Sequence, residues 1–545
     1  MKKYLLYFLV FISFFIGTFR SLLLNITSHL PDWYDYSLQV YIMFQNIAKI
    51  KTLDFEHFFN SNSFYPRPYG MLLSDLLLPQ SLIALPFTYL SANMALIFNI
   101  VFICTFVLNY LALYLFWKQL FGRSSIAFLG ALFFIYSPFT LRELGHFQML
   151  SYWPFFFTFY FILKTEATKK RIYLLYGGLF FALQFLASVY LAVFLILSIF
   201  IFYFFKFLST QKKKEVIIRV FILFVLFVAL DGVFIGGYFD MKRALGLARD
   251  YGEFVTYSAH ITDYFFTTGI NSLLYSAPLI NWWNSFNRHT VGASVAGPGI
   301  LLLILSAGGI YYSFRNNNKK RYIFLFLMAI GFIFSLGPRF SFNGAYLSYH
   351  LPYVILLRLV PFFESIRVVA RWNFLFYIGI IYFSLYFIIE ILKNKKIAKK
   401  SFYLFIFLFL FFLIEYIPVT LSSSPNSYLS KEYDVLKKAC RASKKVLLEV
   451  PITHLQTRGG ILVGLKYIND VQLASLYHGC YVMNGYSGYD FPELITLDTE
   501  INQAYKNSDS TKLMQLLRNT GADYVKINGT ILMTSGIKSE IIQLK

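Results

Sequence analysis

Three aspartates stand in the polar stretch that follows the first apolar segment of the chain. Residues 4–24 are apolar and long enough to cross a bilayer. Asp32, Asp35 and Asp75 follow them, in a chain with 27 acidic against 49 basic residues. A carboxylate at a membrane surface is suited to act as a general base, which takes a proton from an attacking hydroxyl group. We therefore predict chemistry on a lipid-linked substrate here, although Asp75 could instead cap the helix expected after it.

The first two aspartates also have a structural explanation. Residues 36–50 carry apolar side chains at helical spacing with a thin polar face, which predicts a helix lying in the membrane interface. Asp35 would then be the N-cap of this helix, and Asp32 a solvated loop residue. The catalytic interpretation rests on Trp33 and Tyr34, because partial desolvation beside aromatic rings raises the pKa of a carboxyl group toward a useful value.

Arginines gather in a later polar loop, residues 339–372. They are Arg339, Arg358, Arg367 and Arg371. The planar guanidinium fork matches phosphate oxygens, so this loop predicts a phosphate or pyrophosphate ligand. The alternatives are anchoring to lipid headgroups or pairing with an acid, for which Glu364, Asp32 and Asp35 are the candidates.

A short polar turn, LRELGHFQML, contains a further charged group. It adds Arg142, Glu143, His146 and Gln148 between two apolar stretches. A single histidine in a turn is usually structural. His146 is nevertheless predicted on the same side of the membrane as the aspartates and arginines, so we include it among the candidate ligands of a phosphate.

Composition indicates an α-helical polytopic membrane protein. Hydrophobic residues make up 57% of the chain and charged residues only 14%, and apolar runs approach the roughly 20 residues that span a bilayer. Hydropathy predicts eleven spans, near residues 4–24, 93–117, 124–139, 148–164, 172–188, 190–207, 216–236, 298–314, 322–338, 373–392 and 401–420. Several are short for a full crossing, which predicts broken or tilted helices.

Basic residues lie in alternate gaps between these spans. The gaps are 2–3, 118–123, 164–171, 206–214, 315–321 and 393–400. By the positive-inside rule they are cytoplasmic, which places the N-terminus inside and the C-terminus outside. The external parts of the membrane domain 1–420 are then loops 25–92, 237–297 and 339–372 and the turn 140–147. The net charge of +22 is explained by this topology and implies no nucleic-acid partner.

The tail, residues 421–545, is predicted to form a small extracytoplasmic α/β domain. Residues 446–450 and 524–527 have the composition of strands, and 510–519 that of a helix ended by Gly521. The segment NGYSGY at 484–489 interleaves aromatic residues with Asn, Gly and Ser. It suits sugar stacking, and equally a turn packed on the membrane domain.

Cysteine and metal chemistry have little support in the sequence. Cys440 and Cys480 both fall in the tail and could pair or remain free thiols, and three cysteines are too few for a disulfide framework. No metal-ligand spacing, phosphate-binding loop or nucleotide fingerprint is present. We predict no metal site.

The order of several motifs along the chain resembles a known group. They are the acidic first loop, FYPRP, SDLLLPQSLIALP, YSPFTLRELGHFQMLSYWP, LGPRF, LVPFFESIRVVAR and the late NGYSGY. Together they resemble a large group of bacterial membrane proteins related to the GT-C superfamily of glycosyltransferases. The resemblance covers most of the chain, including the tail.

The resemblance implies an inverting glycosyltransferase of the bacterial cytoplasmic (inner) membrane. Such an enzyme moves a sugar from a polyprenyl-phosphate carrier to a glycan or lipid acceptor at the outer face. Asp35 matches the catalytic base best and Asp32 next, and Asp75 would be the second acidic position of the loop. The carrier phosphate would meet Arg339, Arg367, Arg371 and His146. No cofactor is fixed by the resemblance, and a divalent cation is left open.

The chain departs from the superfamily pattern in two places. It lacks an adjacent Asp-Glu pair in a later external loop, and Trp282-Trp283 is followed by Asn284 where oligosaccharyltransferases have WWD. The latter difference argues against protein N-glycosylation. Alternatives to the transferase are a polysaccharide polymerase or ligase with a lipid-linked donor, a non-catalytic scaffold, and a transporter. A transporter would keep its functional charges within its spans, as Arg219 and Asp231 are, whereas the three aspartates and most other charges are predicted to be external.

Overall fold

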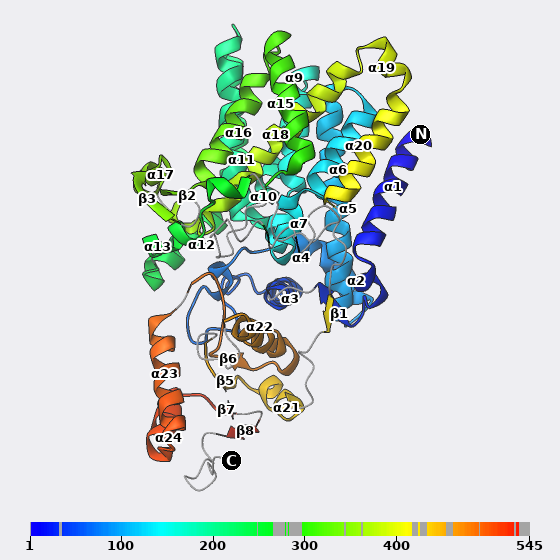
Figure 1. The fold of residues 1–545 in the computed structure, drawn as a ribbon. Coiled ribbons are helices and arrows are strands. Elements are labelled where there is room, and N and C mark those ends of the chain that lie inside the picture. Colours follow the sequence, from blue (N-terminus) through cyan, green and yellow to red (C-terminus); the bar gives the residue numbers. More distant parts are fainter. Residues whose placement is uncertain are drawn as a thin grey trace. The chain divides into compact units, whose positions relative to one another are not determined.

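The computed structural model is largely helical and divides into two compact units (Figure 1). Unit 1 comprises Met1–Leu23, Ile103–Gly232 and Ala248–Leu421, and unit 2 comprises Leu24–Phe102, Val233–Leu247 and Ser422–Lys545. The structure describes residues 2–31, 35–247, 249–264, 278, 282, 297–342, 345–360, 363–416, 423–425, 433–453, 461–489, 491–527 and 530–533.

Unit 1 is built from apolar helices. Its longer helices are α1 (Lys2–Thr18), most of α5 (Met94–Phe121), α6 (Ser124–Ile135), α9 (Trp153–Thr168), α10 (Ile172–Ala187), α11 (Val189–Ser209), most of α12 (Lys213–Leu245), α15 (Gly299–Arg315), α16 (Arg321–Ser335), α18 (Asn373–Ile391) and α20 (Ser401–Tyr416). Short elements connect them: α2 (Arg20–Leu24), α7 (Pro138–Arg142), α8 (Phe147–Leu150), α13 (Tyr251–Thr256), β2 (Arg339–Phe342), β3 (Ala345–His350), α17 (Tyr353–Leu359) and α19 (Lys395–Lys399).

Helix α18 lies at the centre of unit 1 and packs against α15, α16 and α6. Its side chains from Asn373 to Leu385 are almost all buried. Glycines permit the close approach of its neighbours, as small residues do between membrane helices. A Cβ atom on Gly309 of α15 would lie 1.9 Å from the carbonyl oxygen of Phe383.

Each predicted span contains a helix, but the structure does not support eleven full crossings. Five described helical segments are long and apolar enough to cross a membrane: Met94–Phe121, Ser124–Gly145, Val189–Ser209, Lys213–Leu245 and Val369–Ile391. Five others are apolar but shorter: Tyr4–Thr18, Ile172–Ala187, Gly299–Arg315, Arg321–Ser335 and Phe402–Tyr416. These helices fit an integral membrane protein. Prolines shorten some predicted spans, since α9 begins at Trp153 with Pro154 in its first turn.

Unit 2 combines helices with a small mixed sheet. Its elements are β1 (His29–Pro31), α3 (Tyr36–Thr52), α4 (Leu78–Ala84), β4 (Ser423–Pro425), α21 (Asp434–Ala442), β5 (Val446–Val450), α22 (Ile461–His478), β6 (Tyr481–Val482), α23 (Pro492–Lys506), α24 (Ser510–Asn519), β7 (Tyr524–Ile527) and β8 (Thr530–Met533). The strand order is β6-β5-β7-β8, with β5 parallel to β6 and β7, and β8 antiparallel. The predicted strands β5 and β7 and helix α24 are confirmed.

The first loop and the tail fold together in unit 2. The backbone N–H of Val482 donates to Asn62 O (2.7 Å), and that of Tyr65 donates to Val482 O (3.0 Å). The N–H of Phe64 donates to Asn484 O (3.2 Å). Arg67 adds an ion pair with Glu493 at 2.6 Å. The compact unit is therefore larger than the predicted domain 421–545, because the tail shares its contacts with the first loop.

Helix α3 is confirmed as a helix, but its burial differs from that of an interfacial helix. Buried residues occur on every side of it, and it packs against α4 and α22. Its polar side chains are held by protein partners: Ser37 donates to Asp470 (2.7 Å), and Asn46 donates to Leu76 O (2.6 Å). The thin polar face that suggested an interfacial helix is therefore covered by other parts of unit 2, and the location of the helix in the membrane interface stays a prediction.

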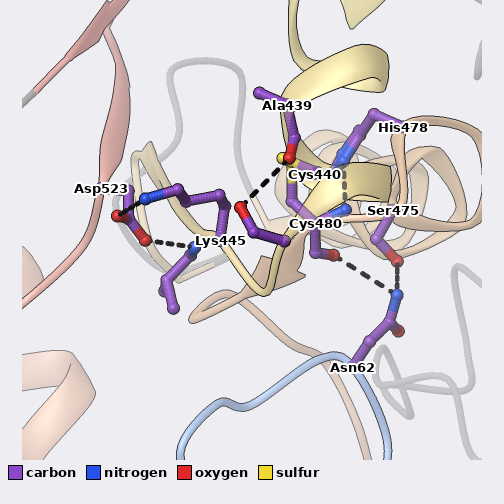
Figure 2. The surroundings of a disulfide bond; sticks show 10 residues. Asn62, Ala439, Cys440, Lys445, Ser475, His478, Cys480 and Asp523 are labelled. Atoms are coloured by element: carbon purple, nitrogen blue, oxygen red, sulfur yellow. Dashed lines mark hydrogen bonds and ion pairs between the residues drawn. A yellow bond between two sulfur atoms is a disulfide. The ribbon is translucent and has the colours of Figure 1, made fainter.

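A disulfide joins Cys440 to Cys480, which decides the alternative that the sequence left open (Figure 2). It links α21 to the residues after α22. Next to it, the N–H of Cys480 donates to Nδ1 of His478 (3.1 Å), so the ring proton belongs on Nε2. His478 is fully buried, and burial, together with the charge of Lys526, lowers its pKa to about 3.

We expect unit 2 to lose stability in mild acid because of His478. The pKa of its side chain falls from about 6.5 in the unfolded chain to about 3 in the folded one. The unfolded state therefore binds more protons between these values, and stability falls as pH drops below 6.5. The loss at pH 5 should be ~2 kcal/mol.

The measurement is the urea midpoint for proteolysis of unit 2 at pH 7.5 and pH 5.0, with the fragments identified by mass spectrometry. His478→Gln should flatten the difference between the two pH values. His57→Gln is the matched control, because the His57 side chain is exposed and lies 3.0 Å from nearby Asp54. An unchanged pH dependence in His478→Gln would contradict the assignment.

Candidate functional site

The predicted site residues are divided between the two units. Asp35 and Asp75 belong to unit 2. The predicted phosphate ligands belong to unit 1: His146, Arg339, Arg367 and Arg371. Asp32 lies outside the described residues, as do its neighbours Trp33 and Tyr34 and, in a later loop, Trp283 and Asn284. Each group is therefore considered within its own unit.

Asp35 occupies the N-cap position of α3 without capping the helix. Its backbone is in the right-handed helical region, and its side chain makes no capping hydrogen bond. The residue is half-buried, next to the fully buried Tyr36. Burial raises the pKa of the Tyr36 hydroxyl well above its usual value, and the Asp35 carboxylate adds to this effect. The side chain of Asp35 therefore does not cap α3, which was the structural explanation for this residue.

Asp75 does not cap the following helix either, because the N-cap of α4 is Leu77. It lies in the segment between the 3₁₀ turn Gly70–Leu73 and α4. Tyr238 of α12 donates a hydrogen bond from its hydroxyl to Ser74 O (3.2 Å). The charges of Asp75 and of Tyr489 from the tail both act on this hydroxyl. Three chain segments of unit 2 therefore meet around Asp75.

Asp35 and Asp75 are not brought together at one point. Asn46 holds the carbonyl of Leu76, the residue after Asp75, by a hydrogen bond of 2.6 Å. Asn46 lies eleven residues after Asp35, which corresponds to about three turns of α3. The two carboxylates therefore lie near different parts of this helix.

Arg371 of unit 1 is paired with a buried carboxylate. Its Nε lies 3.1 Å from Glu143 Oε2, and its terminal nitrogen lies 3.0 Å from the same oxygen. Both residues are almost fully buried. His146 Nδ1 is 3.1 Å from Glu143 Oε2. Tyr190 lies beside the pair, with its ring centroid 5.0 Å from the guanidinium carbon.

Arg371 is predicted as a phosphate ligand, with pairing to Glu364, Asp32 or Asp35 as the alternative. In the structure its charge is instead neutralised by Glu143. A buried pair of this kind fixes geometry: it joins the turn after α7 to the turn that precedes α18. The pair leaves little net charge for a ligand.

The other two arginines lie over tyrosines of one short segment. Arg367 lies over the ring of Tyr257, with its guanidinium carbon 5.2 Å from the centroid. Arg339 is exposed and lies 6.0 Å from the ring centroid of Tyr251. The N–H of Ala370 donates to Tyr257 O (2.9 Å), which ties the arginine loop to this segment. Arg339 is thus more exposed than the buried Arg371, and Arg367 is half-buried.

Glu143, Asp263 and Tyr190 complete the surroundings of Arg142 and Arg371, and the sequence did not predict them as site residues. Glu143 appears in the sequence analysis only as part of a polar turn. The charges of Glu143 and Asp263 both act on the guanidinium group of Arg142. A signal for Glu143 was present, since it is an acid flanked by Arg142 and His146 within an apolar stretch. Asp263 gave no comparable signal. Among the described residues, no group of three or more His, Cys, Asp or Glu could hold a metal.

Comparison with protein families gives one match. Residues 9–414 match the model of a family described as a domain of unknown function (DUF6311). No curated protein matches the chain. The matched range covers the helices of unit 1, both predicted aspartates described in unit 2 and all four predicted phosphate ligands.

We expect Glu143→Gln to destabilise unit 1 by about 3–5 kcal/mol, because it leaves the buried Arg371 without a counter-charge. The double variant Glu143→Gln with Arg371→Met should recover much of this loss. Thermal unfolding in detergent measures both. Arg339→Gln is the control, since an exposed arginine should change stability by less than about 0.5 kcal/mol. Equal unfolding of wild type and Glu143→Gln would show that the ion pair does not stabilise the fold.

Proposed function

Because the chain belongs to the family described as a domain of unknown function (DUF6311), whose description names no activity, we propose a function from its residues. The protein is an inverting glycosyltransferase. It moves a sugar from a polyprenyl-phosphate carrier to a glycan or lipid acceptor at the outer face of a bacterial cytoplasmic membrane. The motif resemblance to GT-C enzymes supplies the reaction class.

The observation that carries the proposal is the compact unit formed by the first loop and the tail. Asp35 is half-buried at the start of α3, and Asp75 lies where the first loop meets Tyr238 and the tail. Neither carboxylate is used to cap a helix. Carboxylates held in place by a folded unit are suited to act as a general base.

The disulfide supports the outer-face location of this unit. Disulfides form and persist in oxidising compartments and are rare in bacterial cytosol. Cys440–Cys480 lies in unit 2, which also contains Asp35 and Asp75. The basic gaps between spans lead to the same orientation by an independent route.

The reaction forms a bond between the acceptor oxygen and the anomeric carbon while the bond from that carbon to the carrier phosphate breaks. Asp35 takes the acceptor proton, with Asp32 and Asp75 as the other candidates. The acceptor attacks opposite the leaving group, so the configuration inverts through an oxocarbenium-like centre. Arg367, Arg339 and His146 stabilise the departing phosphate, and Arg371 holds the loop in place through Glu143.

A transporter is the second candidate, and one observation favours it. Asp231 of α12 is fully buried, and both of its carboxylate oxygens are without a hydrogen-bond partner in the described structure. Arg219, the other charge within this helix, is by contrast paired with Glu166 and Glu215. An ionisable residue left unpaired inside a membrane helix often marks an ion or substrate path.

We expect Asp35→Asn to lower sugar transfer by about 10²–10⁴-fold, because it removes the proton acceptor. The assay follows release of radiolabelled sugar from a panel of polyprenyl-phosphate donors by the full chain in lipid. Asp75→Asn should have a strong effect only if Asp75 is the base instead.

The matched control is Asp54→Asn, because Asp54 lies in the same loop, is exposed and pairs with His57. It should leave turnover unchanged. If wild type releases no sugar from a broad donor panel, the transferase proposal fails. Loss of ion or solute flux in Asp231→Asn alone would then favour the transporter.

A further inference from the structure

The helices of unit 1 contain an apolar cavity. It has a volume of about 70 Å³ and is lined by side chains of α5, α9, α11, α16 and α18. Phe116, Phe155, Phe202, Leu327 and Ile378 are among them. Pockets that hold a whole small molecule commonly have volumes of about 300–1,000 Å³. The cavity is therefore large enough for only part of a ligand.

The wall of the cavity offers no polar group that would recognise a sugar or a nucleotide. Its one hydroxyl, on Ser198, already donates to Phe194 O at 2.7 Å. Burying the polar groups of such a ligand here without partners would cost several kcal/mol. The chemistry that fits this wall is a hydrocarbon chain.

One lysine lies at the edge of the cavity. Lys320, the residue before α16, is exposed and is the one charged member of the lining within the described chain. The adjacent Arg321 is occupied, since its guanidinium donates to Ser313 O (3.0 Å) and to Asn317 Oδ1 (3.3 Å). An ammonium group at the edge of an apolar cavity suits a ligand with a hydrocarbon chain and an anionic head.

The position of the cavity along the helices agrees with this ligand. Leu163, Phe202 and Lys320 line it, and each adjoins or lies within a few residues of a basic gap, 164–171, 206–214 or 315–321. Clusters of basic residues beside membrane helices attract anionic lipids. Lys320 thus lies at the end of the helical unit where anionic headgroups should concentrate.

We propose that this cavity binds part of an acyl chain of an anionic phospholipid, whose phosphate pairs with Lys320. The site lies wholly within unit 1 and does not depend on the glycosyltransferase activity. In the predicted topology it faces the cytoplasmic leaflet, opposite the proposed reaction. The lipid is therefore a bound component of the helical unit, and the sugar donor is a separate ligand.

Native mass spectrometry of the delipidated full chain tests the proposal. Phosphatidylglycerol and phosphatidylcholine with identical acyl chains are added separately. Wild type should retain phosphatidylglycerol at least fivefold better, as expected for one lysine near a phosphate. Lys320→Gln should lose this preference. Lys319→Gln, the adjacent exposed lysine outside the cavity, should keep it.

A second variant tests the cavity itself. Leu163→Trp places a larger side chain on its wall from a half-buried position and should reduce retention of both lipids. Thermal unfolding of each variant confirms that it is folded. Equal retention of the two lipids by wild type, or full retention by Lys320→Gln, overturns the proposal. Stronger retention of a polyprenyl phosphate than of phosphatidylglycerol would assign the cavity to the donor instead.

Discussion

Backbone hydrogen bonds between residues 62–65 and 482–484 are the constraint on which unit 2 depends. A polar loop cannot bury its main-chain groups unless each finds a partner, and the tail supplies these partners. Gly485 shows how closely the two segments approach, because a Cβ atom there would lie 2.5 Å from the ring of Phe64. The positions of Asp35 and Asp75 follow from this joint folding, since α3 packs between α4 and α22 of the same unit.

A related constraint acts in unit 1, where charges lie among apolar helices. Burying a charge is costly unless an opposite charge and hydrogen bonds accompany it. Glu143 and Arg371 meet this requirement together, and Arg219 meets it with Glu166 and Glu215. The pairing divides the arginines by task. Arg371 is paired with Glu143, whereas Arg339 and Arg367 lie over tyrosine rings.

The two proposals assign different parts of the molecule to different ligands. The polar, disulfide-linked unit 2 contains Asp35 and Asp75, and unit 1 contains the arginine loop. The apolar cavity beside Lys320 is lined by helices of unit 1 alone and offers contacts of a kind that suit a lipid chain. The proposed lipid site therefore shares no described side chain with the residues proposed for catalysis.

The sequence by itself determined the helical membrane class, the positions of the apolar helices, the strands β5 and β7 and helix α24. These follow from local composition and periodicity, which act over a few residues. It could not determine the number of full crossings, because prolines and polar residues shorten helices in ways that hydropathy windows average out.

Only the tertiary structure decided which distant residues meet. Glu143 and Arg371 are separated by 228 positions, and Asn62 and Ser475 by 413. The tertiary structure also determines the burial of α3, the Cys440–Cys480 disulfide and the separation of Asp35 from Asp75. Such pairings depend on how whole elements pack, and a single sequence carries no periodic signal for contacts at that separation.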